Sequence, residues 1–422
     1  MDLRIFPLFF FLDVMQMDIL SAMEQKSVWL SFLEYRKDSF RLSETEEQQL
    51  RAFIEKEKYL PILEKIRRVE PFPRPRRAAI SKKSSSKKRI VYVYPPEEAL
   101  VLKMMTHLLL RRYDRLFLPN LYSFRAGHGV KEAVNFLRRI PGIDTMWSYK
   151  ADISNYFNSI PVERLLPMLE TALEDDPAVC RFISGLLLDP FVYDRGKLIS
   201  EEKGIMAGCP LSTFLANLYL KELDALFYEN RWIYARYSDD IIIFAPTKED
   251  LDARIARIHQ ALAEKGLTMN PAKESITAPG EKWVFLGVSF LDGNVDVAPV
   301  SVEKIKAKMR RKMRALQRWA DRKNVSGVSA AKAFIRVFNQ KLFENPISND
   351  LTWARWFFPL ITTDASLHVI DRYAQQCIRT LATGKHTKSA YNFRYEQMKE
   401  LGYISLVNRY YSFHSGKEKE ES

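Results

Sequence analysis

Two neighbouring aspartates, Asp239 and Asp240, stand between two runs of strand-forming residues. The run before them, 232–237, is rich in aromatic residues, and the run after them, Ile241–Phe244, consists of four consecutive apolar residues. A short, wholly apolar run is typical of a strand that is buried on both faces. The pattern therefore predicts a hairpin whose turn carries both carboxylates. Taken alone, such a pair is far more often a plain turn than a metal site, because Asp side chains bond to nearby backbone amides.

Two further segments favour the interpretation of that pair as part of a metal site. The segment 148–157 predicts a strand that ends on Asp152, and the segment 204–217 predicts a glycine-marked loop that leads into a helix. One aspartate at a strand end and a pair on an adjacent hairpin would place all the carboxylates at one sheet edge. Carboxylate oxygens hold Mg²⁺, and two such ions roughly 4 Å apart can activate a 3′-hydroxyl and stabilise a leaving pyrophosphate. The residues therefore suggest nucleotide addition.

In order and spacing, these segments resemble the palm motifs of reverse transcriptases. The resemblance rests on Asp152, on the loop and helix Gly208–Asn217, and on the tetrapeptide from Tyr237 to Asp240, and it covers the chain from Lys87 to Gly287. It implies an enzyme that copies an RNA template into DNA from dNTPs. It also implies an α+β right-hand polymerase fold of fingers, palm and thumb, with an antiparallel palm sheet and a helical C-terminal thumb.

The resemblance assigns the catalytic centre residue by residue. Asp152, Asp239 and Asp240, with the backbone carbonyl of Ile153, are expected to bind two Mg²⁺ ions, for which Mn²⁺ could substitute. Lys273, in a segment that resembles another family motif, is expected to protonate the leaving pyrophosphate as a general acid. For Lys273 the alternative is an ordinary surface cation.

The resemblance also implies contacts with the incoming nucleotide. Lys88 and Arg89, just before an expected strand, and Arg125 are expected to hold the triphosphate. Gly208 and Tyr237 are expected to belong to the same substrate-binding surface. Arg125, like Lys273, could instead be a plain surface cation.

Two positions bear on substrate choice. Phe157 lies five residues after Asp152, where the resemblance implies a ring that collides with a ribose 2′-hydroxyl and so favours dNTPs. Packing in the core is the other interpretation of this residue. Ala207 is a departure, because many bacterial reverse transcriptases have glutamine there, and a methyl group cannot hydrogen-bond to the nucleotide or the template.

The expected organisation has three parts. Residues 1–141 are expected to form N-terminal helices and fingers, residues 142–299 the palm, and residues 300–422 the helical thumb and C-terminal tail. Finger-like insertions are expected within the palm range, between 160 and 204.

Local patterns predict individual elements. Apolar residues at helical spacing predict helices over 24–70, and a similar pattern predicts a helix over Glu97–Tyr113. The segment Pro71–Arg89 is dense in Pro, Arg, Lys and Ser, which predicts a loop before a strand at Ile90–Tyr94. Ten Lys or Arg residues in Glu303–Lys323 predict a helix with one packed face and the others able to lie along phosphates.

The overall charge is consistent with a polyanionic partner. The chain has 65 Lys and Arg against 52 Asp and Glu, a formal charge of +13, which favours nucleic acid or an anionic membrane surface. No apolar run approaches the roughly 18–20 residues that span a bilayer, so we expect no membrane partner. Three scattered cysteines suggest a reducing cytoplasm. The apolar stretch Ile5–Leu12 is interpreted as a packed terminal segment, with a signal-peptide core as the alternative.

The C-terminal stretch Tyr391–Tyr411 resembles the tail of standalone reverse transcriptases of the unknown group, which are associated with antiphage defence. That resemblance implies a dedicated structured non-coding RNA as template. The aromatic tail could equally pack in the thumb, stack on bases or prime DNA synthesis from a tyrosine. Three rival functions remain open: an RNA-dependent RNA polymerase, a non-catalytic RNA-binding scaffold, and template-independent DNA synthesis, which Ala207 keeps open.

The position of Phe157 generates a prediction. Phe157→Ala should raise the use of NTPs relative to dNTPs in primer extension, because it removes the ring that would collide with the 2′-hydroxyl. The ratio of NTP to dNTP incorporation by the variant and the wild-type protein is the measurement. An unchanged ratio would remove the selection role and leave Phe157 as a core residue.

Overall fold

The structure, a computed structural model, describes residues 17–40, 42–81, 88–343, 352–385 and 387–416. The apolar stretch 5–12 lies outside these residues. The chain forms two compact units: the first consists of Met1–Ala133 and Met146–Ala278, and the second of Val134–Thr145 and Pro279–Ser422. The three ranges expected from the sequence do not coincide with these units, because the first unit combines most of the expected fingers with most of the expected palm.

The central sheet of the first unit has four antiparallel strands in the order β6-β7-β3-β8. These strands are β3 (Trp147–Asp152), β6 (Tyr234–Tyr237), β7 (Asp240–Ala245) and β8 (Ser275–Thr277). Every residue of β7 from Ile241 to Ala245 is buried, and helix α13 (Lys248–Glu264) packs on β3 and β7. The prediction of a hairpin with a fully buried second strand is confirmed.

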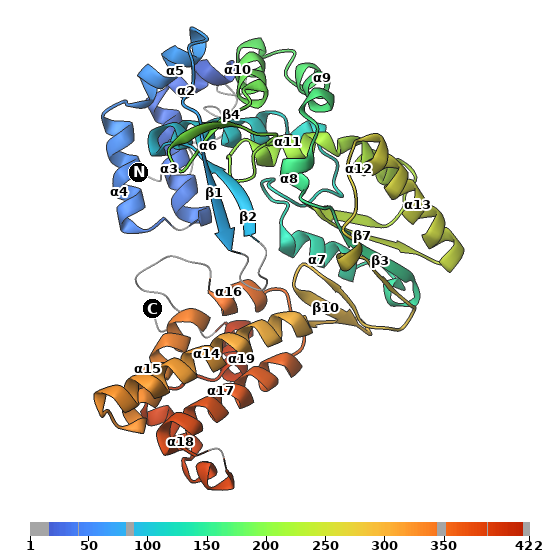
Figure 1. The fold of residues 1–422 in the computed structure, drawn as a ribbon. Helices are drawn as coiled ribbons and strands as arrows, with labels where there is room; N and C mark the ends of the chain where they lie inside the picture. Colours follow the sequence, from blue (N-terminus) through green and yellow to red (C-terminus); the bar gives the residue numbers. More distant parts are fainter. Residues whose placement is uncertain (1–16, 41, 82–87, 344–351, 386, 417–422) are drawn as a thin grey trace. The chain divides into compact units, whose positions relative to one another are not determined.

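Buried helices complete the core around this sheet (Figure 1). Helix α11 (Ser212–Tyr219) has nearly all of its residues buried and packs on α6 (Pro96–Arg112) and α9 (Val162–Ala172). Other helices of this unit are α8 (Tyr156–Ser159), α10 (Pro177–Leu188) and α12 (Lys221–Glu229), while α7 (Val130–Arg138) continues from the first unit into the second. The helices expected over 97–113 and after the loop at 204–211 are therefore confirmed.

A second sheet of the first unit has the order β2-β1-β4-β5. Its strands are β1 (Arg76–Ser81), β2 (Lys88–Val93), β4 (Phe191–Asp194) and β5 (Lys197–Ser200). The expectation of a loop throughout 71–89 is wrong where β1 forms. The cause is pairing: β1 runs antiparallel to β2 from Arg76↔Val93 to Ser81↔Lys88, and a strand stabilised by its neighbour can tolerate a composition typical of loops.

Among the described residues, four helices precede this sheet, and three of them lie in the range 24–70 where helices are expected. They are α2 (Ile19–Glu24), α3 (Lys26–Phe40), α4 (Glu44–Glu55) and α5 (Tyr59–Arg67). Helix α4 begins with a capping box, in which the side chains of Ser43 and Glu46 each accept a hydrogen bond from the other's backbone amide. The fully buried Trp29 of α3 stacks on Tyr59 at 4.9 Å between ring centroids and ties these helices together.

The second unit contains a three-stranded antiparallel sheet of β9 (Trp283–Phe285), β10 (Val288–Leu291) and β11 (Asn294–Val297). The turn between β9 and β10 consists of Leu286 and Gly287, whose φ angles of 49° and 87° suit a tight two-residue hairpin. The Asp144 carboxylate fixes the sheet to the segment Ile143–Thr145, because it accepts hydrogen bonds from Trp283 Nε1 at 3.1 Å and from the Gly293 amide at 2.7 Å.

The rest of the second unit is helical (Figure 1). Helices α14 (Pro299–Lys323), α15 (Gly327–Leu342) and α17 (Ala365–Thr383) pack against one another. Gly327 permits the close approach of α15 to α17, because a Cβ there would lie 2.4 Å from the Leu381 carbonyl oxygen. Shorter helices follow this bundle or lie within it: α16 (Trp353–Phe357), α18 (Tyr395–Glu400) and α19 (Leu406–His414).

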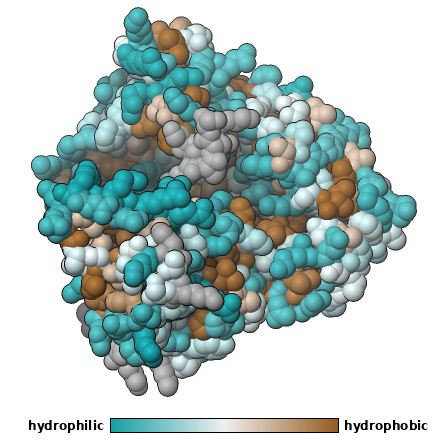
Figure 2. Space-filling model, turned by 60° about the horizontal axis from the view of Figure 1, so that its bottom comes forward, coloured by the Kyte–Doolittle hydropathy of each residue, from teal (hydrophilic) through white to brown (hydrophobic). Residues whose placement is uncertain are grey.

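Helix α14 has the two kinds of face that its sequence predicts. Ile305, Met309, Leu316 and Ala320 are buried against the other helices, whereas most of its Lys and Arg residues are exposed. Figure 2 shows hydrophilic side chains over most of the face drawn there, with hydrophobic ones scattered among them. Among the described residues, no helix combines the length and the apolar character needed to cross a membrane.

Candidate active site

The structure brings the three candidate carboxylates to one edge of the central sheet. Asp152 is the last residue of β3 and Asp240 the first of β7, and the two are direct partners in the strand register. Asp239 lies in the turn that joins β6 to β7, where Ser238 has a φ of 59°. The Asp239 carbonyl oxygen also accepts a hydrogen bond from the Ile153 amide at 3.2 Å. One hairpin and one strand end therefore hold all three acids.

Gathering these acids is electrostatically unfavourable. Burial, together with the neighbouring Asp152 and Asp240, raises the pKa of Asp239 to about 6. Burial also raises the pKa of Asp240, an effect that Lys150 on β3 opposes from 4.0 Å. Burial and neighbouring acids disfavour the ionised carboxylates. A cation at this edge would stabilise the ionised carboxylates, so its binding is favoured.

Lys273 provides one such cation in this structure. Its Nζ lies 2.6 Å from Asp152 Oδ1. Backbone hydrogen bonds place the lysine there, because the Asn270 amide donates to the Asp152 carbonyl at 2.8 Å and the Ser154 amide donates to the Thr268 carbonyl at 2.9 Å. The segment that carries Lys273 thus runs alongside the end of β3, as a role at the catalytic edge requires.

The donor set suits a hard divalent cation, because three carboxylates offer the oxygen ligands that Mg²⁺ prefers. Within the described part of the chain, however, no three Asp, Glu, His or Cys side chains are gathered closely enough to surround one ion. Lys273 supplies a positive charge beside Asp152.

Phe157 lies at a point where the loop 204–208 meets the end of β3. Its ring is half-buried and meets the Tyr156 ring edge-on at 5.7 Å, and its carbonyl accepts a hydrogen bond from the Ile205 amide at 2.9 Å. Gly204 is required at this contact, because its φ is 52° and a Cβ would lie 2.6 Å from the Phe157 carbonyl oxygen. The backbone of Phe157 is therefore held firmly against the loop 204–208.

Asn158 joins this loop to strand β2. Its side-chain Oδ1 accepts a hydrogen bond from the Ala207 amide at 2.9 Å, and its Nδ2 donates to the Ile90 carbonyl at 3.3 Å. The Tyr92 amide donates to the Ala207 carbonyl at 2.8 Å, so the loop pairs with β2 on the backbone as well. Gly208 packs directly on that strand, where a Cβ would meet Val91 Cβ at 3.1 Å.

The candidate triphosphate contacts fall into two groups. Lys88 and Arg89, the first residues of β2, are exposed. Arg125, by contrast, is 5% exposed, and Asp114 accepts from its Nε and Nη2 at 2.8 and 3.1 Å. Its Nη1 donates to two backbone carbonyls. In this structure Arg125 shapes its own loop, and its expected contact with a triphosphate stays a prediction.

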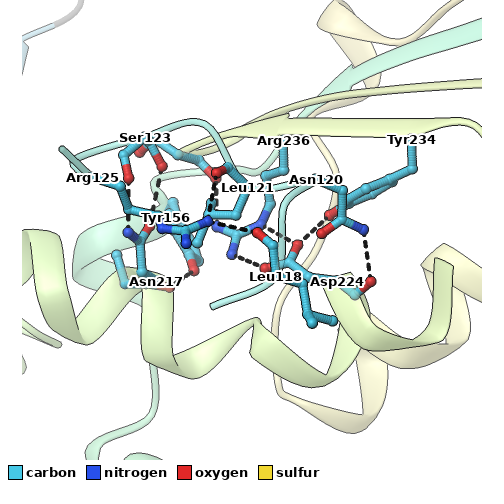
Figure 3. A network of polar contacts seen from close by, with 12 residues as sticks. Leu118, Asn120, Leu121, Ser123, Arg125, Tyr156, Asn217, Asp224, Tyr234 and Arg236 are labelled. Carbon is cyan, nitrogen blue, oxygen red and sulfur yellow. Dashed lines mark hydrogen bonds and ion pairs between the residues drawn. The ribbon is translucent and has the colours of Figure 1, made fainter. Parts of the chain in front are cut away.

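A buried ion pair between Arg236 and Asp224 lies next to the aspartate turn, and Figure 3 shows its two partners. Arg236 and Asp224 are 0% and 1% exposed, and Arg236 Nε and Nη2 donate to the two carboxylate oxygens at 2.7 and 2.5 Å. Arg236 Nη1 donates to the Ser238 carbonyl at 3.2 Å, within the turn itself. The Tyr234 hydroxyl donates to Asp224 at 2.8 Å. Helix α12 therefore holds the turn through one guanidinium group.

The same network joins the loop around residues 120–125 to the palm strands. The Arg236 amide donates to the Asn120 carbonyl at 3.0 Å, and the Tyr122 amide donates to the Arg236 carbonyl at 2.9 Å. Ser123 and Asn217, both fully buried, exchange two hydrogen bonds at 3.1 and 2.9 Å (Figure 3). The loop that carries Arg125 is therefore anchored to β6 and α11.

Four structural residues of the site were not singled out from the sequence: Asn158, Asp224, Arg236 and Lys150. Arg236 carries a usable signal, because an arginine inside a strand that leads to the aspartate turn needs a buried partner. Asn158, Asp224 and Lys150 carry no comparable signal. Their partners depend on how distant segments meet.

The fold and this edge of carboxylates define a right-hand polymerase. Residues 80–290, half of the chain, match the family model described as "Reverse transcriptase (RNA-dependent DNA polymerase)". The chain belongs to this family. The match covers the whole central sheet of the first unit, all of the second sheet except most of β1, and strands β9 and β10 up to residue 290.

Curated relatives are distant. The chain is 25% identical over 210 residues to the group II intron-encoded protein LtrA of Lactococcus lactis subsp. cremoris, which covers 49% of this chain and 34% of that protein. It is 27% identical over 157 residues to an uncharacterized 91 kDa protein in the cob intron of Schizosaccharomyces pombe, covering 37% and 19%. The chain thus spans about a third or less of these relatives' lengths.

Among solved structures, the chain is similar to apo telomerase from Candida tropicalis. The TM-score is 0.46 at 12% identity, over 78% of this chain and 59% of that chain. Telomerase from Candida albicans in complex with a fragment of telomeric RNA gives a TM-score of 0.42 at 14% identity, over 80% and 62%.

The ion pair under the turn generates a prediction. Arg236→Met alone leaves a buried carboxylate without its partner and should lower the free energy of unfolding by about 3–5 kcal/mol. Arg236→Met combined with Asp224→Leu should recover much of that loss, since no buried charge remains. The double variant should still extend primers about tenfold or more slowly, because the Ser238 carbonyl has lost its donor.

Chemical denaturation and primer extension measure the two effects separately. A double variant with wild-type stability and wild-type kcat would mean that the pair contributes to stability alone. A loss of kcat at recovered stability would establish Arg236 as a positioning residue for the turn.

Proposed function

We propose that the protein is an RNA-directed DNA polymerase that adds deoxynucleotides by two-metal-ion catalysis. The observation that carries the proposal is the strand register that sets Asp152 opposite Asp240, with Asp239 in the adjoining turn and Lys273 at 2.6 Å from Asp152. These residues provide both the metal ligands and a proton donor at one sheet edge. Membership of the reverse transcriptase family supports the choice of reaction.

Asp152, Asp239 and Asp240, with the Ile153 carbonyl, would hold the two Mg²⁺ ions, which when bound make the 3′-hydroxyl nucleophilic and stabilise the leaving pyrophosphate. Mn²⁺ has similar ligand preferences and could replace Mg²⁺. Lys273 carries a proton at Nζ and lies beside Asp152. From there it can give that proton to the departing pyrophosphate as a general acid.

The surroundings of the carboxylates support the choice of deoxynucleotides. Phe157 is fixed by the Gly204–Ile205 backbone, so that its ring cannot easily withdraw from a 2′-hydroxyl. Lys88 and Arg89 are exposed at the start of β2, which is tied to the loop of Ala207 and Gly208. They would hold the triphosphate electrostatically, while Gly208 and Tyr237 would line the substrate surface.

Helix α14 supplies a surface for a nucleic-acid backbone. Lys304, Arg311, Arg314 and Arg318 are exposed on it, opposite its buried apolar face. Evenly distributed cations of this kind bind phosphates without reading sequence. We propose that this helix follows the template–primer duplex.

A dedicated structured non-coding RNA as template, and a role in antiphage defence, rest on the resemblance of the C-terminal stretch alone. Part of this stretch packs within the second unit: the Tyr403 hydroxyl donates to Asp371 at 2.8 Å, and the Tyr410 hydroxyl donates to the Ile361 carbonyl at 3.2 Å. Tyr391 and Tyr411 are exposed and remain candidates for stacking on bases.

Two alternative functions predict different products from the proposed polymerase. A non-catalytic RNA-binding scaffold would need no metal at the carboxylate edge and would make no DNA. Template-independent DNA synthesis would use the same carboxylates, and Ala207 provides no hydrogen-bonding side chain next to Gly208. Products that match a supplied template base for base would exclude both.

The metal-site assignment generates a prediction. Asp239→Ala combined with Asp240→Ala should reduce DNA synthesis to background, because the ions lose two of their three carboxylates. RNA binding should be largely retained, since the exposed cations are unchanged. Primer extension on an RNA template, and sequencing of the RNA and DNA that co-purify with each protein, are the measurements.

Glu249→Ala combined with Asp250→Ala is the matched control, because it removes an adjacent acidic pair from the first turn of α13. It should synthesise DNA like the wild-type protein. Synthesis by the Asp239/Asp240 variant near the wild-type rate would sink the metal-site assignment. One abundant RNA with complementary DNA, absent from that variant, would support a dedicated template, and a random RNA mixture would speak against one.

A further inference from the structure

The first unit contains a cavity that is not lined by the residues of the carboxylate edge. Its volume is about 870 Å³, within the range of small-molecule sites. It is lined by the end of α5, the proline-rich segment 71–75, helix α10 and the neighbourhood of β4. None of the candidate metal or nucleotide residues lines it. The proposed polymerase reaction therefore gives this cavity no role.

Lys203 is the feature of this cavity that calls for a ligand. Its residue is 4% exposed, and it is one of the lining residues. Among the described residues, none forms a hydrogen bond or an ion pair with its ammonium group. The nearby Asp189 is already engaged, because it accepts from Arg74 Nε at 2.8 Å and from the Phe191 amide at 2.9 Å. A largely buried cation with no carboxylate in direct contact favours the entry of an anion beside it.

The charge and shape of the cavity lining indicate the chemical class of the ligand that carries this anion. Four basic residues line the cavity, Arg67, Arg74, Arg181 and Lys203, against the two acidic residues Glu70 and Asp189. The remaining wall is largely aromatic and proline-rich, with Phe72 and Phe182 in edge-to-face contact at 5.0 Å between ring centroids. Cations beside flat apolar walls suit a phosphate joined to a base.

We propose that this cavity binds a nucleotide, with its phosphate at Lys203 and its base against Phe72 and Phe182. The nucleotide is either a free nucleoside monophosphate or one unpaired nucleotide of an RNA strand, and both present the same phosphate and base. The site goes beyond the proposed polymerase function, because it uses neither the carboxylates nor a metal ion.

The cavity also adjoins the loop that faces the polymerase site. The Lys203 carbonyl accepts a hydrogen bond from the Met206 amide at 2.9 Å, and the Tyr94 hydroxyl, from the cavity wall, lies 3.5 Å from the Met206 sulfur. Met206 precedes Ala207 and Gly208, which pair and pack with β2. A ligand at Lys203 is therefore one residue away from the loop that carries the candidate substrate contacts.

Isothermal titration of the full chain in EDTA tests the proposal, because without Mg²⁺ the polymerase site contributes little nucleotide binding. The probes are AMP, adenosine, inorganic phosphate and the oligonucleotide r(A)5. AMP should bind at one site per chain, more tightly than adenosine or phosphate alone, and the part of r(A)5 binding that Lys203→Met removes reports this site rather than the exposed cations of α14. Lys203→Met should weaken that binding about tenfold or more, since it removes a desolvated charge–phosphate contact.

Lys197→Met, an exposed lysine of β5 outside the cavity, is the matched control and should bind like the wild-type protein. Lys203→Met should keep or raise the Tm, because a buried unpaired charge is replaced by an apolar chain of similar length. If this variant fails to fold, Lys203→Gln is measured in its place. AMP as tight as r(A)5 would identify a free nucleotide as the ligand, and tighter r(A)5 would identify RNA.

Three results would overturn the proposal: no binding of AMP or r(A)5, equal binding by the Lys203 variant and the wild-type protein, or phosphate alone binding as well as AMP. Binding in EDTA does not depend on DNA synthesis. A failure here therefore leaves the polymerase proposal intact, and a failed primer extension leaves this site intact.

Discussion

The pairing of β3 with β7 is the interaction on which the site depends. It sets Asp152 opposite Asp240 and, through the short turn from β6, brings Asp239 to the same edge. Burial, together with the neighbouring negative charges of Asp152 and Asp240, raises the pKa of Asp239 to about 6. Such an edge is stable only with positive charge beside it. Lys150 and Lys273 supply part of that charge, and the proposed divalent ions would supply the rest.

Rigid surroundings hold this unfavourable cluster in place. The hydrophobic strand β7 fixes the turn from one side, and the buried Arg236–Asp224 pair reaches the Ser238 carbonyl from another. Asn158 and the glycines of the loop 204–208 then hold that loop against β2 and Phe157. Lys203, directly before the same loop, is a second charge that the fold keeps largely buried, and the proposed nucleotide would bring an anion beside it.

The elements predicted from the sequence are those whose signal is local. The apolar run after Asp240 predicts a buried strand, and the spacing in 303–323 predicts a helix with one packed face; both are confirmed. Strand β1 was missed because its stability comes from pairing with β2 and not from its own composition. Asn158 could not be recognised either, since its partner Ala207 is 49 residues away in the sequence. Arg125 shows the converse, because its motif suggests a ligand contact while its structure shows a bidentate pair with Asp114.

A crystal structure of the protein with an RNA template, a DNA primer, a dNTP and Mn²⁺, measured at the manganese absorption edge, tests the central claim most directly. We expect two anomalous peaks roughly 4 Å apart, between Asp152 and Asp239, with Lys273 released from Asp152 towards the triphosphate. Manganese bound elsewhere, with the Lys273–Asp152 contact intact and the primer end away from the turn, would contradict it.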